Sequence, residues 1–155
     1  MALAINTILV ATDFSEASQS ATTYALRLAR ALQAQLYLLH VVPEEDIRLL
    51  TGISQHLQSL LTAQTLTDVL YTEAEKRLAQ LIQEAQAADI VQERLVVTGP
   101  PAETILSWAL AKKVQLIILG THGRSGLSHF LMGSVAEQVL RQAPDAVLVV
   151  PPQTR

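Results

Sequence analysis

The chain has 155 residues, of which 50% are apolar and 16% are charged, and this length fits one domain with a sizeable core. Its net charge is −3, from 11 basic and 14 acidic residues, without the basic cluster that is typical of nucleic-acid binding proteins. The chain contains no cysteine, which excludes disulfides, thiolate metal sites and thiol catalysis.

The apolar runs are short, and none approaches the ~20 residues that a membrane-spanning helix requires. The first ten residues lack the basic region of a signal peptide and are soon followed by Asp13. We therefore expect a soluble, cytoplasmic protein that binds neither membranes nor nucleic acid.

Five short runs with strand character alternate with helical patterns along the chain. They span residues 7–11, 35–42, 94–98, 114–119 and 146–150. These runs are apolar almost throughout, which is typical of strands that are covered on both faces of a parallel sheet.

Amphipathic helical patterns fill the connections between these runs. Asp13 and Ser15 are competing N-cap candidates for the first helix. Residues 100–101, both proline, open the third helix, and Ser134 opens the fourth, which stops before Pro144. Apolar residues at helical spacing mark the inward faces, namely Ala21, Ala25, Leu28, Ala29 and Leu32, then Ala74, Leu78, Leu81, Ile82 and Ala85, then Ala102, Ile105, Leu106 and Ala109, and finally Val135, Ala136, Val139 and Leu140.

This order of elements predicts a single α/β domain over residues 1–155. Right-handed crossovers between parallel strands place helices on both faces of the sheet, so we expect a doubly wound, Rossmann-like, five-stranded parallel sheet. Residues 44–67 fit this pattern least well, because Gly52 interrupts a sequence that indicates one or two short helices. That segment is either a cover over the strand ends or an elaborated connection.

Two segments follow predicted strands at the edge where ligands bind in open parallel sheets, beyond the carboxyl ends and near the reversal of strand order. Asp13 follows the first strand, where a carboxylate can accept hydrogen bonds from ribose or hold a metal ion through water. Helix capping is its competing role. After the fourth strand comes a loop over residues 120–134, which contains four of the six glycines of the chain.

The glycine-rich loop has the features of a phosphate site. Glycine allows positive φ and a close backbone approach, and Ser134 would bring the free N–H groups of a helix N-terminus. Arg124 is the only Arg or Lys in the loop. These features favour a phosphate cradle over a surface loop in which the glycines only form turns. His122 and His129 match no common zinc spacing, so they are candidates for phosphate contact or for plain surface positions.

The spacing of the loop glycines resembles a known motif. Gly120-x2-Gly123-x9-Gly133-Ser134 is similar to the nucleotide motif G-x2-G-x9-G-[S/T] of the universal stress protein family. Residues 8–15 resemble the first strand and acidic turn of that family, residues 99–102 the start of its third helix, and residues 146–151 its closing strand. The likeness therefore covers nearly the whole chain.

The resemblance implies the sheet order 3-2-1-4-5 and a bound adenine nucleotide, ATP or its products ADP and AMP, with Mg²⁺ entering through the phosphates. Adenine would contact the backbone of Val41, and ribose would lie near Asp13 and Gly120. It further implies a homodimer in which the two last strands pair. The expected binding residues are Ala11, Thr12, Asp13, Val41, Leu119, Gly120, Gly123, Arg124, His129, Gly133, Ser134 and Val135.

Three functions remain open at this point. The first is an ATP-binding module of stress response or signalling, in which the nucleotide biases conformation or partner choice. The second is a slow ATP hydrolase, and the third is a partner-binding dimer with a vestigial pocket. The intact glycine spacing argues against the third, and the lack of a convincing general base argues against the second. We therefore assign no catalytic and no metal-ligating residue, and the sequence identifies no protein partner.

Overall fold

A five-stranded parallel sheet lies at the centre of the computed structural model, which describes residues 4–53, 63–123 and 132–153. The strand order is β3-β2-β1-β4-β5, which confirms the predicted order and fold class. The strands are β1 (Thr7–Ala11), β2 (Gln35–Val42), β3 (Val91–Thr98), β4 (Leu116–Gly120) and β5 (Ala146–Val150).

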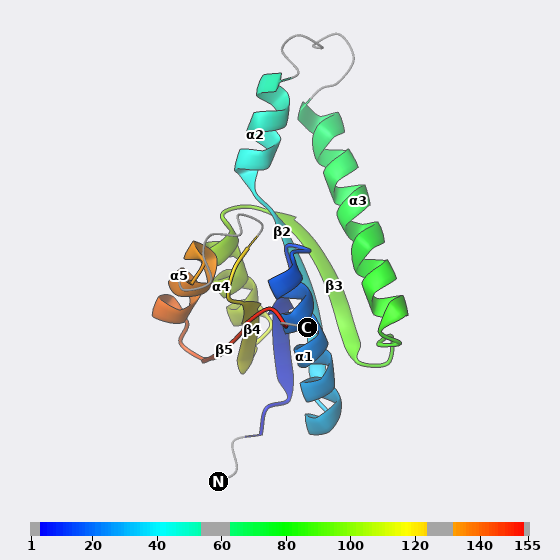
Figure 1. The fold of residues 1–155 in the computed structure, drawn as a ribbon, viewed down its shortest axis with the longest axis vertical. Coiled ribbons are helices and arrows are strands. Elements are labelled where there is room, and N and C mark those ends of the chain that lie inside the picture. The colour runs from blue at the N-terminus through cyan, green and yellow to red at the C-terminus, as the bar shows by residue number, and fades with distance from the viewer. Residues whose placement is uncertain (1–3, 54–62, 124–131, 154–155) are drawn as a thin grey trace.

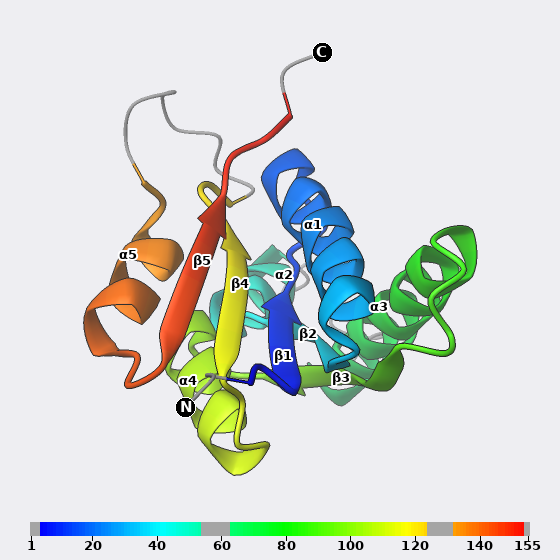
Figure 2. The same cartoon turned by 90° about the horizontal axis from the view of Figure 1, so that it is seen from below.

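Helices cover both faces of this sheet (Figure 2). Ile8 and Val10 of β1 belong to the core beneath α1 (Glu16–Leu32) and α3 (Ala63–Glu84). Leu9 points to the opposite face, where α4 (Pro101–Ala111) and α5 (Ser134–Gln142) pack. This alternation follows from the two-residue period of a strand and gives one core on each face. Among the described helices, none is both long and apolar enough to cross a membrane.

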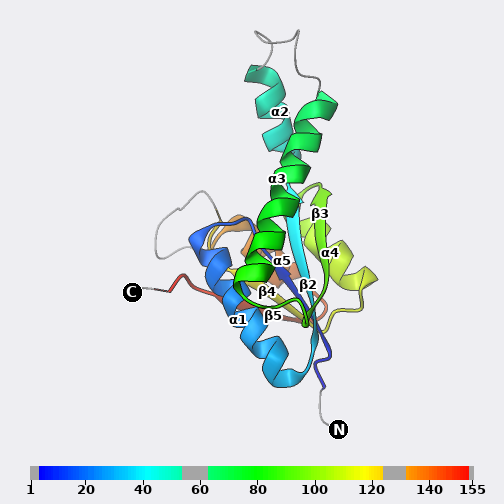
Figure 3. The same ribbon diagram turned by 90° about the vertical axis from the view of Figure 1, so that its right-hand side faces the viewer.

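The connection between β2 and β3 holds two helices, a short one within the segment 44–67 where one or two were expected, and the predicted helix that follows it. Helix α2 (Glu44–Ile53) follows β2, and the 22-residue α3 runs through the predicted second helix. Figures 1 and 3 show α2 and the first half of α3 standing beyond the carboxyl end of the sheet. Part of the uncertain segment 44–67 therefore rises above this edge, and residues 54–62 lie outside the described residues.

Two strands differ from the prediction in their boundaries. Strand β3 begins at Val91 instead of 94, because this edge strand starts with exposed polar residues that do not resemble a buried strand. Strand β4 begins at Leu116 instead of 114 and ends at Gly120. Val114 lies in the turn that follows α4, where its N–H donates to the carbonyl of Ala109 at 2.9 Å, after Lys113 with φ 53°.

Two residues assigned to inward helix faces are instead exposed. Leu32 and Leu140 are both 41% exposed. Each lies next to the buried stripe and in the last turn of its helix, where the sheet no longer covers the side chain. Of the two N-cap candidates of α1, the structure has Ser15 at the N-cap and not Asp13. The hydroxyl of Ser15 accepts a hydrogen bond from the N–H of Ser18.

Candidate functional site

A pocket of about 800 Å³ opens at the carboxyl ends of the strands. The ends of β1, β2 and β4 and the starts of α2, α4 and α5 form its walls. This size is within the ~300–1,000 Å³ range of small-molecule sites. Arg124 and His129 lie outside the described residues. The other predicted site residues all line this pocket, namely Ala11, Thr12, Asp13, Val41, Leu119, Gly120, Gly123, Gly133, Ser134 and Val135.

Asp13 lies on the turn between β1 and α1, at the floor of this pocket. Its Oδ1 accepts a hydrogen bond of 3.0 Å from the N–H of Ser15. The preceding residue, Thr12, is buried, and its Oγ1 lies 3.0 Å from Oγ of Ser18. These contacts hold the turn from the side of α1, so the Asp13 carboxylate has a fixed place beside the pocket.

Gly120 has a packing role that the sequence did not reveal. A Cβ atom at this position would stand 2.7 Å from the carbonyl carbon of Ala17 and 2.9 Å from the N atom of Ser18. Both are backbone atoms of α1, which cannot move aside cheaply. Glycine is therefore needed for the end of β4 to approach the first turn of α1, whatever the pocket binds.

Gly133 lies where the backbone is crowded, although its own dihedral angles are ordinary. Its φ is −63°, and its N–H donates to the carbonyl of Thr121 at 2.7 Å. A Cβ atom here would lie 3.3 Å from that carbonyl oxygen and 3.4 Å from Cα of His122. The expectation of positive φ is thus wrong for the described loop glycines, because the two limbs of the loop approach closely instead. Among all described glycines, only Gly99 has a positive φ.

Ser134 is the first residue of α5, but its hydroxyl does not cap the helix. Gly133 occupies the N-cap position without a side-chain hydrogen bond, and Ser134 is exposed. Ser134 therefore opens the helix as predicted, with Gly133 as the cap before it. In any helix the first N–H groups have no intrahelical acceptor. The amides of Ser134 and Val135 at the pocket wall therefore offer the donors and the positive dipole end that favour an anion.

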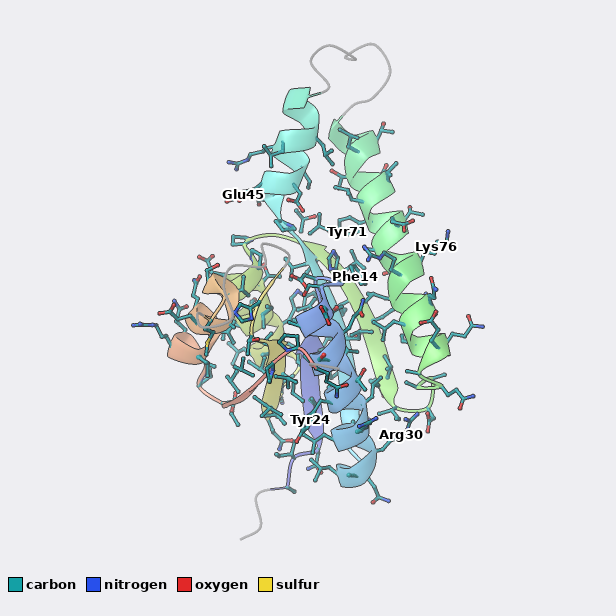
Figure 4. All side chains as sticks on the ribbon, in the orientation of Figure 1. Phe14, Tyr24, Arg30, Glu45, Tyr71 and Lys76 are labelled. Atoms are coloured by element: carbon teal, nitrogen blue, oxygen red, sulfur yellow. The ribbon has the colours of Figure 1, made fainter. Side chains whose placement is uncertain are left out.

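Several carboxylates at the pocket were missed by the sequence analysis. Arg48 lies among them and pairs with Glu44 at 3.3 Å. Figure 4 shows Glu45 at the base of α2. The rule that ligands bind beyond strand ends could have found these residues, because α2 starts two residues after β2. The carboxylates that line the pocket besides Asp13 are Glu44, Glu45, Asp46 and Glu103.

The two histidines of this region have different surroundings. His122 lines the pocket, and its Nδ1 lies 2.9 Å from Oγ1 of Thr121. His40 is buried on β2, and its Nδ1 lies 2.8 Å from the carbonyl oxygen of Thr12. Because a carbonyl can only accept, Nδ1 of His40 carries the proton and donates. Within the described residues, no group of three or more His, Cys, Asp or Glu is arranged to hold a metal ion.

The fold is that of an open α/β protein with a pocket at its switch point, and comparison with known proteins gives the family. The profile described as "Universal stress protein family" matches residues 4–151. The chain is 32% identical over 143 residues to universal stress protein MJ0531 of Methanocaldococcus jannaschii, covering 92% of this chain and 80% of that protein. It is 34% identical over 151 residues to universal stress protein YxiE of Bacillus subtilis, covering 94% and 98%. The chain belongs to the universal stress protein family.

Solved structures agree with this assignment. The structure of MJ0577 from Methanocaldococcus jannaschii superposes with a TM-score of 0.78 at 28% identity, over 99% of this chain and 100% of that one. Universal stress protein UspA from Lactobacillus plantarum superposes with a TM-score of 0.77 at 26% identity, over 96% and 99%. A universal stress protein in complex with cAMP superposes with a TM-score of 0.64 at 25% identity, over 97% and 99%.

Proposed function

We propose that this chain is an adenine-nucleotide-binding module of stress response or signalling, and that its ligand is ATP. The nucleotide would lie with adenine against Val41, ribose beside Asp13 and phosphates against the start of α5. In this proposal the module comprises the whole of residues 1–155, acts in the cytoplasm, and forms a homodimer through β5.

The observation that carries the proposal is the arrangement of the glycine motif around one pocket. Gly120, Gly123 and Gly133 all line it, and the two loop limbs approach so closely at Gly133 that a side chain there would be crowded. The first amides of α5 lie on the same wall, where an anion is favoured. A cradle of backbone donors binds phosphate without a cluster of basic side chains, in keeping with the net charge of −3.

The relatives support an adenine nucleotide as the ligand class. One universal stress protein of similar fold was solved in complex with cAMP. Another, from Archaeoglobus fulgidus, was solved with dAMP, and at 18% identity its likeness to this chain concerns the fold alone. Both ligands combine adenine with a phosphate, which matches a pocket with a backbone-lined end for an anion.

The carboxylates that line the pocket, called the acidic wall here, affect whether ATP would bind alone or as its Mg²⁺ complex. Asp13, Glu103 and the carboxylates at the start of α2 give the described part of the pocket more negative than positive groups. A free polyphosphate would be repelled by this wall, whereas its Mg²⁺ complex carries less negative charge. Asp13 could reach such an ion through a water molecule, so we propose that Mg²⁺ enters with the phosphates.

Isothermal titration calorimetry with Mg-ATP, ADP, AMP and Mg-GTP tests the proposal. We expect a Kd in the micromolar range for ATP, or about −8 kcal/mol, and weaker binding for GTP. Native mass spectrometry of the freshly purified protein would reveal a nucleotide that co-purifies. No binding heat and no thermal shift at millimolar nucleotide would refute the proposal.

A further inference from the structure

Phe14 has an unusual backbone conformation directly beside the pocket. Its φ is 65°, in the left-handed region that bulky residues rarely occupy. The residue follows Asp13 and precedes Ser15, the N-cap of α1. Such strain costs free energy and persists only where the surroundings enforce it, often at ligand sites. The contacts of Phe14 therefore show which residues hold the turn in this conformation.

Two side chains from other elements hold the ring of Phe14. The ring of His40 on β2 lies against it, with a distance of 4.6 Å between ring centroids and an angle of 37°. The guanidinium of Arg77 on α3 lies over it, with Cζ 4.0 Å from the ring centroid. Figure 4 shows Phe14 between the start of α1 and α3. Aromatic contacts and a cation over an aromatic face are both attractive.

Hydrogen bonds complete the support of this turn. The N–H of Phe14 donates to Oγ1 of Thr12 at 3.1 Å, and His40 Nδ1 donates to the carbonyl oxygen of Thr12. The residues on both sides of Asp13 are thus anchored to β2 and α3. Asp13 itself is anchored by the Ser15 amide, which donates to its Oδ1. The direction of the Asp13 carboxylate depends on all of these contacts together.

We propose that Phe14, held between His40 and Arg77, is the positioning residue that fixes the Asp13 carboxylate at the floor of the pocket. Arg77 thereby makes the ligand site dependent on the seating of α3 against the sheet. A second contact of α3 lies on the same side of the pocket, since the hydroxyl of Tyr71 is 2.9 Å from Oγ1 of Thr98, next to the pocket residue Gly99. The effect on ligand affinity rests on the proposed function, whereas the effect on Asp13 does not.

Three substitutions separate positioning from general stability. Arg77→Met keeps the length of the side chain and removes its charge, and Arg77 is exposed, so the variant should fold. Arg77→Lys keeps a cation over the ring. Lys112→Met is the matched control, because Lys112 also lies over aromatic rings, 5.4 Å from Trp108 and 5.2 Å from Tyr37, and does not line the pocket.

The first measurement uses the ligand-free protein. The amide of Ser15 donates to Asp13, so its proton chemical shift and hydrogen exchange report on that hydrogen bond. We expect Arg77→Met to shift this resonance and to speed its exchange, with partial recovery in Arg77→Lys and no change in Lys112→Met. An unchanged Ser15 amide in Arg77→Met would overturn the proposal, and so would an equal change in Lys112→Met.

The second measurement is ATP affinity by calorimetry, beside the urea unfolding free energy of each variant. Loss of the cation should weaken binding about two- to fivefold in Arg77→Met. Phe14→Leu, which loses both ring contacts, should weaken it about tenfold. Wild-type protein that binds no nucleotide while the Ser15 amide still responds would refute the proposed function and support the positioning role. Wild-type binding that none of these variants weakens would overturn the proposed control of the ligand site.

Discussion

The carboxylate of Asp13 lies against Gly123, so that a Cβ atom built on Gly123 would stand 3.0 Å from Asp13 Oδ2. Gly123 is the second glycine of the motif, and Asp13 is distant from it in sequence, on the turn after β1. The contact joins the acidic turn and the glycine loop across the pocket. Because Gly123 has no side chain, the Asp13 carboxylate can occupy the space beside its backbone.

Gly123→Ala tests this contact. The added methyl group should displace the Asp13 side chain, because 3.0 Å is shorter than an ordinary contact of a Cβ atom. We expect ATP to bind about tenfold more weakly, or ~1.4 kcal/mol, as measured by calorimetry. Gly52→Ala on α2 is the control, since no atom lies within 4 Å of its new Cβ, and it should leave binding unchanged. Equal affinities of wild type and Gly123→Ala would contradict the expected geometry.

Gly120→Ala should act on stability first. Its Cβ would meet the backbone of Ala17 and Ser18, so α1 and β4 would have to separate. Overpacking of this kind costs ~1–3 kcal/mol. Urea denaturation should therefore show a lower unfolding free energy without a change in slope. An unchanged midpoint would mean that the first turn of α1 moves more easily than the structure indicates.

Gly133→Val and Ser134→Ala form a contrasting pair at the start of α5. The valine side chain would be forced against the carbonyl of Thr121, which should open the loop and abolish detectable ATP binding by calorimetry. Ser134 is exposed and caps nothing, so its loss should change stability by less than ~0.5 kcal/mol. A folded Gly133→Val variant with wild-type affinity would show that the phosphate site lies elsewhere.

The alternation of strands and helices followed from local apolar runs, and the edge that holds the pocket followed from the rule that ligands bind beyond strand ends. The strand order came from the family resemblance that the glycine spacing carries. The contacts that explain individual residues are not local. Gly120 is needed because of Ala17, and the φ of Phe14 is held by Arg77 from another helix. Such pairs meet only after the sheet has formed. The N-cap of α5 is likewise set by the loop geometry, which places Gly133 at that position without a side-chain hydrogen bond.

Val149→Lys tests the proposed dimer. Strand β5 is an edge of the sheet, and Val149 on it is only partly buried. An apolar edge invites pairing with another chain, and a lysine there opposes it. We expect analytical ultracentrifugation to show a wild-type dimer and a larger monomer fraction in Val149→Lys. The control is Val69→Lys on α3, which adds the same charge at a position that is 57% exposed and far from β5 in the chain. A monomeric wild type at high concentration would exclude this assembly.

The last prediction separates a nucleotide-binding module from an enzyme: we expect ATP hydrolysis to be slow or absent. Fast phosphoryl transfer needs a positioned nucleophile, neutralisation of the developing charge and a firmly held metal ion. The pocket does contain carboxylates that the sequence analysis missed, but Glu44, Glu45 and Asp46 stand at the start of α2, beyond Val41, where adenine is proposed to bind. In the proposed binding mode they lie nearer to the base, so their charge opposes a free polyphosphate from a distance but they do not reach the reacting atoms.

At the proposed phosphate end, the described residues offer few groups that could drive the reaction. Asp13 Oδ1 accepts from Ser15, and His122, beside Thr121, is the described side chain best placed to orient a water molecule. Turnover should therefore be well below the ~1–10³ s⁻¹ of typical enzymes. Phosphate release should be measured for wild type, His122→Ala and His129→Ala, with ATP affinity as the control for intact binding. A rate above roughly 1 s⁻¹ that either substitution abolishes without weakening binding would make this chain an ATPase.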